Sequence, residues 1–260
     1  MSYRRGLGWI GYIKEPNAAI KHGYHKIMAQ EPEIEIPNVK YGWIPFVLDQ
    51  GEIGSCGPHA AITMMAATMI QNQHKDWVRL SPVALYYYVR EVMGTIHSDS
   101  GVYNRVMLEV MRTRGAPAWH LWPYINDKWD VAPSAEANAD AEKHQILEYH
   151  EITNFDETIH ALATGRGLIT GVPVFKSFED INSSNNIITM PKPNEKILGG
   201  HDMYYFGYHL QDKLIYVLNS WGYGWGKNGV AAMTFEYFKK LASDTWTITL
   251  MEDSGIGNGR

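Results

Sequence analysis

The 260-residue chain has a single cysteine, Cys56, so no disulfide can form within it. No apolar run reaches membrane-spanning length, and the net charge of −5 is spread along the chain without a basic face for nucleic acid. The N-terminus, MSYRRGLGWIGYIK, lacks the apolar core of a secretory signal. We therefore expect a cytoplasmic protein, which includes the host cytoplasm or virion of a virus, with neither nucleic acid nor a membrane as partner.

The eleven histidines form no pattern typical of a metal site. His22 and His25 in the first segment have no cysteine or carboxylate at metal-ligand spacing, so we expect solvated side chains there. The sequence predicts no metal and no cofactor.

The stretch from Asp49 to Ile70, DQGEIGSCGPHAAITMMAATMI, changes character at its cysteine. A Gly-rich polar approach gives way at Cys56 to an Ala- and Met-rich run that predicts a buried helix, and Pro58 suits a first helical turn. Unpaired amides and the positive dipole end at a helix start favour a thiolate. A buried, inert cysteine is the alternative at this level of evidence.

Helices are predicted in the first half of the chain and strands in the second. The Ser81-Pro82 pair and Gly94 bound one helix, and another follows Gly101 and stops at Gly115. Weaker helical signals lie at 17–30 and 134–147, the latter equally consistent with a mobile excursion. The second half predicts a long loop over 176–198, a short helix over 156–164 and strands over 148–153, 168–175, 202–209, 214–219, 230–234 and 245–251.

This order of elements predicts an α+β protein with two lobes and a site in the cleft between them. The helical lobe is expected over about 41–147 and an antiparallel sheet or barrel over about 148–260. Residues 1–40 are expected to be a surface strap or a short pro-segment.

Four groups of residues resemble the papain-like cysteine peptidases, in the style that lacks a signal and disulfides. They are Gln50-Gly51 with Gly54-Ser55-Cys56, Gly101 with the following helix and Trp122-Pro123-Tyr124, Gly199-Gly200-His201, and the block Asn219-Ser220-Trp221-Gly222-Tyr223-Gly224-Trp225-Gly226 with Gly229. The last resembles the NSWGxxWGxxG block of that family. His201 and Asn219 lie 145 and 163 residues after Cys56, against about 130 to 150 in the family.

The resemblance implies a role for each of these residues. His201 would hold Cys56 as a thiolate, and the side-chain carbonyl of Asn219 would orient the imidazole. Gln50 and the Cys56 backbone N–H would stabilise the oxyanion.

Three further positions would contact the substrate or support the site. Gly101 would pair with an extended substrate, Gly200 would lie beside it, and Trp221 would cover the contact between His201 and Asn219. A simple helix-entry glycine is an equal alternative at Gly101.

Two other residues bear on the expected site. His59, one turn beyond Cys56, is a rival base, although a neighbour at i+3 usually points along the helix. Asp202 stands where the family has a small residue, and its carboxylate is expected either to raise the imidazolium pKa or to face solvent.

The resulting prediction is a cysteine peptidase that hydrolyses a peptide or isopeptide bond through an acyl-enzyme, with a peptide or protein as substrate. A catalytically silent module that binds peptide or protein in the same cleft, and an acyltransferase, are the alternatives. The mechanism requires folding to bring the Cys56 sulfur within hydrogen-bonding reach of the His201 imidazole, in a groove that water can reach.

Overall fold

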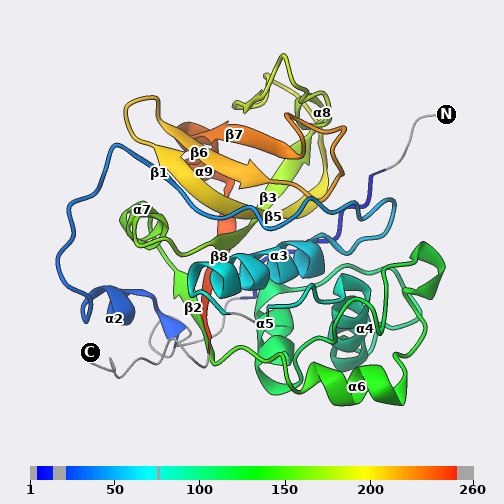
Figure 1. Ribbon diagram of the computed structural model, residues 1–260. Coiled ribbons are helices and arrows are strands. Elements are labelled where there is room, and N and C mark those ends of the chain that lie inside the picture. Colours follow the sequence, from blue (N-terminus) through cyan, green and yellow to red (C-terminus); the bar gives the residue numbers. More distant parts are fainter. Residues whose placement is uncertain (1–4, 14–21, 75–76, 251–260) are drawn as a thin grey trace.

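The computed structural model describes residues 5–13, 22–74 and 77–250, and Figure 1 shows the arrangement of its elements. Helix α3 crosses the middle of the molecule between the strands and the other large helices. The helices are α2 (His25–Met28), α3 (Cys56–Gln71), α4 (Pro82–Met93), α5 (Asn104–Thr113), α6 (Ala135–Ala141), α7 (Phe155–Ala163), α8 (Lys176–Glu179) and α9 (Phe235–Leu241), with a 3₁₀ turn at Asn126–Lys128.

The predicted helix boundaries agree with the structure where local chemistry defines them. The Ser81 side chain accepts a hydrogen bond from the Ala84 backbone N–H, which caps α4, and Gly94 ends that helix with a φ of 71°. Helix α3 covers the predicted span and is buried on most faces over its first three turns. The 134–147 prediction reduces to the short helix α6, and only part of the 17–30 prediction falls within the described residues, as α2.

One sheet joins most of the strands in the order β2-β8-β3-β5-β6-β7-β4, with β1 paired to β5. The strands are β1 (Val39–Tyr41), β2 (Glu148–Ile152), β3 (Leu168–Phe175), β4 (Ile187–Ile188), β5 (Ile197–His209), β6 (Leu214–Leu218), β7 (Val230–Thr234) and β8 (Ser243–Thr249). All pairs are antiparallel except β4 with β7, which is parallel. The α+β class is therefore confirmed, whereas a wholly antiparallel sheet is not.

The segment 176–198 is not the long structureless loop that the sequence predicts. It contains helix α8 and strand β4, and strand β5 begins at Ile197. Its Asn-rich turn returns the chain to the sheet, where β4 pairs with β7. The short apolar pair Ile187-Ile188 is too brief for a period-2 pattern to reveal it.

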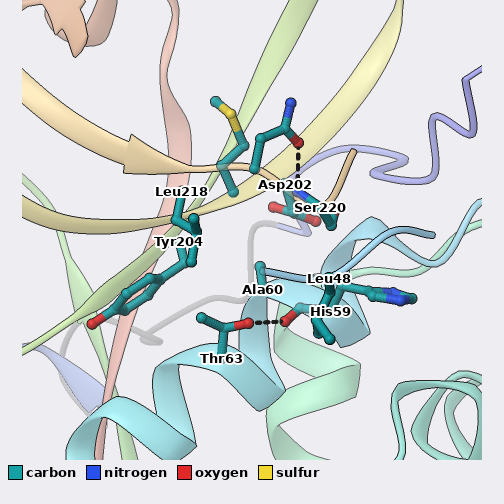
Figure 2. Close-up of a pocket in the computed structure, with 10 residues that line it drawn as sticks. Leu48, His59, Ala60, Thr63, Asp202, Tyr204, Leu218 and Ser220 are labelled. Carbon is teal, nitrogen blue, oxygen red and sulfur yellow. Dashed lines mark hydrogen bonds between the residues drawn. The ribbon is translucent and has the colours of Figure 1, made fainter. Parts of the chain in front are cut away.

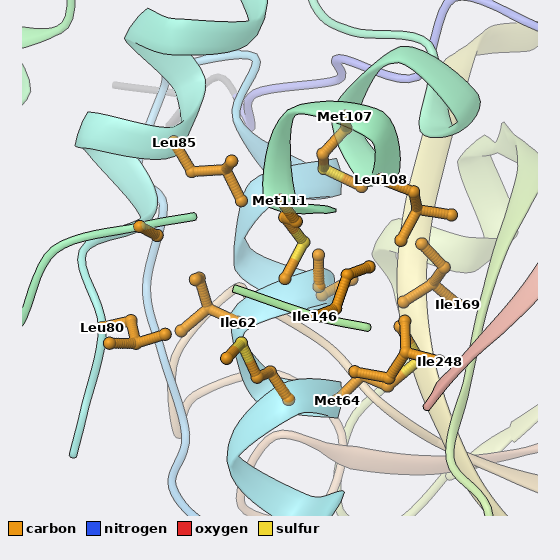
Figure 3. Packing of buried hydrophobic residues seen from close by; sticks show 14 of the residues in the cluster. Ile62, Met64, Leu80, Leu85, Met107, Leu108, Met111, Ile146, Ile169 and Ile248 are labelled. Carbon is orange, nitrogen blue, oxygen red and sulfur yellow. The ribbon is translucent and has the colours of Figure 1, made fainter. Parts of the chain in front are cut away.

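Two hydrophobic clusters of buried residues hold the fold together. In the first, apolar side chains of α3, α4 and α5 pack against strands β3 and β8, as Figure 3 shows for Ile62, Leu85, Met111, Ile169 and Ile248. The second lies within the strand-rich half and includes Trp221 and Trp225. No helix among the described residues is long and apolar enough to span a membrane.

Candidate active site

Cys56 is the first residue of α3, where the loop 49–55 turns into the helix. Its side chain is 0% exposed. Burial raises the pKa of Cys56, and the backbone amide of Asp202, from strand β5, lies close enough to the thiol to oppose that shift. The sulfur of the helical half therefore lies against the strand that carries His201.

His201 and Asn219 come from the neighbouring strands β5 and β6 and are brought together by their pairing. The His201 Nε2–H donates to Asn219 Oδ1 at 2.7 Å, and the same oxygen accepts the Ser220 backbone N–H at 2.7 Å. The opposite ring nitrogen, His201 Nδ1, is buried and has no hydrogen-bond partner among the described residues, so the expected hydrogen bond to the Cys56 sulfur is not formed in this structure. The pair therefore leaves one imidazole nitrogen available for a reacting group.

Trp221 covers this pair. Its ring lies 4.7 Å from the His201 ring at an interplanar angle of 36°, and the side chain is 1% exposed. Phe178 packs edge-on against Trp221, with the ring centroids 5.6 Å apart. The hydrogen bond between His201 and Asn219 is consequently shielded from water, which strengthens it.

Gln50 is fully buried, and both ends of its amide are hydrogen-bonded. Its Oε1 accepts from Ser220 Oγ at 2.6 Å, which fixes the orientation of the amide. Its Nε2 donates to Ile53 O at 2.8 Å and to Gly6 O at 3.2 Å. The side chain thus presents an oriented N–H donor, and a carbonyl of the N-terminal segment accepts from it.

His59 lies on the same helix but is engaged elsewhere. Its Nδ1 is hydrogen-bonded to the Ser55 carbonyl at 2.8 Å, and its ring packs edge-on against Tyr124. Burial lowers the pKa of His59 to about 4. His59 therefore already has a hydrogen-bond partner, the carbonyl of Ser55 at the start of its own helix.

A cavity of about 10 Å³, the space of roughly one water molecule, lies behind these residues. Figure 2 shows Asp202 and Ser220 on one side of it and His59, Ala60 and Thr63 of α3 on the other. Residues from both halves of the molecule therefore line this small cavity.

Residues 6–9 of the N-terminal segment lie across the cleft. The Gly6 N–H donates to Gly51 O at 3.0 Å, the Val102 N–H to Gly8 O at 2.7 Å, and the Trp9 N–H to Gly200 O at 3.2 Å. The Gly8 backbone amide also favours the thiolate form of Cys56. The segment therefore bridges both halves of the molecule directly over the thiol.

This crossing depends on glycine at the points of contact. A Cβ on Gly8 would lie 1.7 Å from Gly54 O, and a Cβ on Gly101 would lie 2.0 Å from Gly8 O. Gly101 also has a φ of 73°, which a side chain disfavours. The two backbones can approach this closely only because neither position carries a side chain.

The expectation of a groove open to water is wrong for this form of the protein. With Cys56 covered, burial and the nearby Asp202 carboxylate raise the pKa of the thiol to about 12. Burial likewise lowers the pKa of His201 to about 4, although the Asn219 hydrogen bond opposes the shift. At neutral pH both groups are uncharged, because no water remains to solvate the ion pair.

Both expectations for Asp202 are also wrong. The side chain is fully buried rather than solvent-facing, and its Oδ1 accepts from Asn104 Nδ2 at 2.8 Å. Successive side chains of a strand point to opposite faces, so Asp202 points away from the His201 ring. It does not raise the imidazolium pKa; burial raises the pKa of Asp202 itself.

Two of the positions predicted to contact substrate, Gly101 and Gly200, lie beside the N-terminal segment in this structure. Gly200 accepts from Trp9, whereas the Gly101 N–H donates to Tyr86 Oη at 3.0 Å and the neighbouring Val102 pairs with the segment. Sequence reasoning missed Gly6, Gly8 and Trp9 as residues of the site. Their signal was the pair of glycines beside a tryptophan, a composition typical of close backbone approach.

Comparison with known proteins shows the family to which the chain belongs. The family described as papain family cysteine protease matches residues 34–244. An uncharacterized peptidase C1-like protein of Acanthamoeba polyphaga mimivirus is 33% identical over 224 residues, which is 81% of this chain and 72% of the viral protein. The chain belongs to the papain family of cysteine proteases.

Solved structures of papain-family members share the fold. Xylellain, a cysteine protease from Xylella fastidiosa, superposes with a TM-score of 0.83 at 26% identity, covering 97% of this chain and 99% of xylellain. The procathepsin B S9 of Trypanosoma congolense superposes with a TM-score of 0.66 at 12% identity, covering 95% and 86% of the two chains, which shows the fold alone. The predicted papain-like α+β fold is confirmed.

Proposed function

We propose that this chain is a cysteine peptidase that cleaves peptide bonds through an acyl-enzyme on Cys56. One observation carries the proposal. Asn219 orients the His201 imidazole and leaves its Nδ1 without a hydrogen bond among the described residues, and the backbone amide of the next residue, Asp202, contacts the Cys56 thiol. A thiol at a helix start, an oriented imidazole and a preformed amide donor are the three parts that acyl transfer to sulfur requires.

Each part has a defined step in the reaction. His201 Nδ1 takes the thiol proton, and the sulfur attacks the peptide carbonyl carbon. Gln50 Nε2 and the Cys56 backbone N–H donate to the resulting oxyanion. The imidazolium then gives its proton to the departing amine, while Asn219 Oδ1 holds the ring in place. Water hydrolyses the thioester in the second half of the reaction and regenerates the thiol.

We further propose that residues 5–10 keep the peptidase latent. They would be the inhibitory part of the pro-segment expected within residues 1–40. Gly6 O of the segment accepts the hydrogen bond from Gln50 Nε2, and Cys56 is buried beneath the segment. A substrate therefore cannot bind until the segment leaves. Its departure would readmit water, lower the pKa of Cys56 and raise that of His201. A reducing compartment such as the cytoplasm suits an enzyme whose single cysteine must stay a thiol.

The test is cleavage of a peptide library by the Gly8→Val variant, which cannot hold the segment against Gly54. We expect cleavage by this variant, and none once Cys56→Ala is added to it. Cleavage that persists without Cys56 would overturn the proposal. A Gly8→Val protein whose thiol reacts freely but which cleaves no peptide would instead support the silent binding module.

A further inference from the structure

Residues 6–9, which cover the thiol, lie in a slot between two stretches of backbone. A Cβ on Gly8 would lie 1.7 Å from Gly54 O, and a Cβ on Gly101 would lie 2.0 Å from Gly8 O, so backbone meets backbone on both sides. Gly54 belongs to the loop that leads into Cys56, and Gly101 belongs to the loop that leads into α5. The spacing between these two loops therefore decides whether an extended chain fits over the sulfur.

One carboxylate joins the two sides of this slot. Both oxygens of Asp99 accept the Gly54 backbone N–H, at 3.0 Å and 3.1 Å. The Tyr86 hydroxyl donates to Asp99 Oδ1 at 2.5 Å, and the same hydroxyl oxygen accepts the Gly101 backbone N–H at 3.0 Å. Gly54 and Gly101 are thus connected through two side chains, those of Asp99 and Tyr86.

Helix α4 places this connection. Tyr86 is fully buried on α4, and burial together with the Asp99 hydrogen bond raises the pKa of its hydroxyl, which therefore stays protonated and donates. Arg90, one turn further along the helix and also fully buried, donates through Nη1 to Ile96 O at 2.8 Å and to Ser98 O at 3.0 Å. These two bonds hold the loop that ends in Asp99 against the helix.

Any chain that reaches the thiol must lie in this slot. No disulfide can fix the two loops to each other, because Cys56 is the single cysteine. A substrate whose carbonyl carbon meets the sulfur replaces residues 6–9 and encounters the same spacing.

We infer that Asp99 and Tyr86 are positioning residues that set the width of the slot, for residues 6–9 in this structure and for the substrate backbone during cleavage. The role toward the substrate rests on the proposed peptidase function. The role toward residues 6–9 does not, so the two are tested separately.

The first test measures access to the thiol in the intact chain. Asp99→Ala removes the acceptor that both loops share, whereas Asp99→Asn keeps an oxygen that can accept from Gly54. Alkylation of Cys56 by iodoacetamide should be about fivefold faster in Asp99→Ala than in the wild type, because residues 6–9 are held less firmly in a loosened slot. Asp99→Asn should restore most of the protection.

The matched control is Ser98→Ala, in the same loop. Within the described part of the chain, Ser98 forms hydrogen bonds only through its backbone, so this variant should alkylate at the wild-type rate. An Asp99→Ala rate equal to that of the control would overturn the inference. A faster rate that is fully explained by a lower free energy of unfolding, measured in urea for each variant, would also overturn it.

The second test separates the two sides of the slot and uses the Gly8→Val protein with a peptide that it cleaves. Tyr86→Phe cuts the connection to Gly101 and leaves the bond between Asp99 and Gly54 in place. It should raise KM by about fivefold and change kcat by less than about twofold, because only the alignment of the bound backbone is lost. Asp99→Ala also frees the loop that leads into Cys56, so it should lower kcat by about tenfold as well.

A merely structural role would reduce the amount of folded enzyme, which lowers the apparent kcat and leaves KM unchanged. An unchanged KM in both variants would therefore overturn the positioning role toward the substrate. Absence of any cleavage by the Gly8→Val protein would count against the peptidase proposal alone. The alkylation rates would still decide whether Asp99 holds residues 6–9 in the slot.

Discussion

Two parts of the N-terminal region bind the rest of the chain in different ways. Residues 6–9 form hydrogen bonds with three separate segments, at Gly51, Val102 and Gly200, and lie over the thiol. Strand β1 (Val39–Tyr41) pairs only with the outer part of β5, away from the site. The difference separates a segment that covers Cys56 from one that completes the sheet.

The largest expected effect breaks the first of these contacts. Gly8→Val should speed the alkylation of Cys56 at pH 7 by at least about 100-fold, because the thiol pKa should fall from about 12 toward its ordinary value of 9.0 or below. Mass spectrometry of the iodoacetamide-treated protein measures the rate. The matched control is Gly224→Val, since Gly224 has no atom within 4 Å of an added Cβ. Similar rates in the two variants would show that residues 6–9 do not protect the thiol.

A second prediction concerns the Gln50 N–H donor, which the N-terminal segment and the substrate oxyanion would each use. Gln50→Glu removes the N–H donor, which is hydrogen-bonded to Gly6 O in the covered form. Alkylation of Cys56 should become faster, because the segment loses this bond. In the Gly8→Val background, kcat should fall by about 100- to 1000-fold, because the oxyanion loses the same donor. An alkylation rate and a kcat that both rise, or both fall, would contradict a shared role of Gln50 in holding the segment and stabilising the oxyanion.

A third prediction concerns the sheet side of the comparison. Hydrogen bonds at Asn38 and Gly42 flank Lys40, which lies opposite Tyr208, so Lys40 stands at a hydrogen-bonded position of the ladder. Lys40→Pro should lower the free energy of unfolding by about 2–3 kcal/mol, measured in urea, because it removes a ladder bond and crowds the strand. Cys56 should stay unreactive in the folded protein. A reactive thiol in this variant would show that β1 also guards the cleft.

The smallest expected effect is a pH dependence at Asp244, whose Oδ2 accepts a hydrogen bond from the Trp9 Nε1–H at 3.0 Å. Its folded pKa is raised from 3.8 to about 6, so ionising it costs more in the folded state than in the unfolded state. The free energy of unfolding of the wild type should therefore fall relative to Asp244→Asn as pH rises from about 4 through 6, by about 1–2 kcal/mol. The difference between their urea unfolding curves at several pH values measures it. A difference that rises with pH would contradict the raised pKa.

How much of this the sequence could predict depends on the range of the interactions. The cap at Ser81, the start of α3 and the strand β3 follow from local patterns, and the structure confirms them. The His201–Asn219 pair was expected from the family resemblance, and the structure brings the two side chains together.

The covered cleft could not be predicted in the same way. It requires Gly6, Gly8 and Trp9 to meet residues about 45 to 235 positions away, a distance that no local pattern encodes. The burial of Asp202 arises from strand register, which becomes visible only once β3, β5 and β8 are paired.

The central claim, that Cys56 and His201 act as a pair once residues 6–9 leave, is tested most directly by the pH dependence of Cys56 alkylation in the Gly8→Val protein. We predict an inflection well below pH 9 that moves up to about 9 when His201→Gln is added, because the imidazolium no longer stabilises the thiolate. An inflection near pH 9 that is the same with and without His201 would contradict the account.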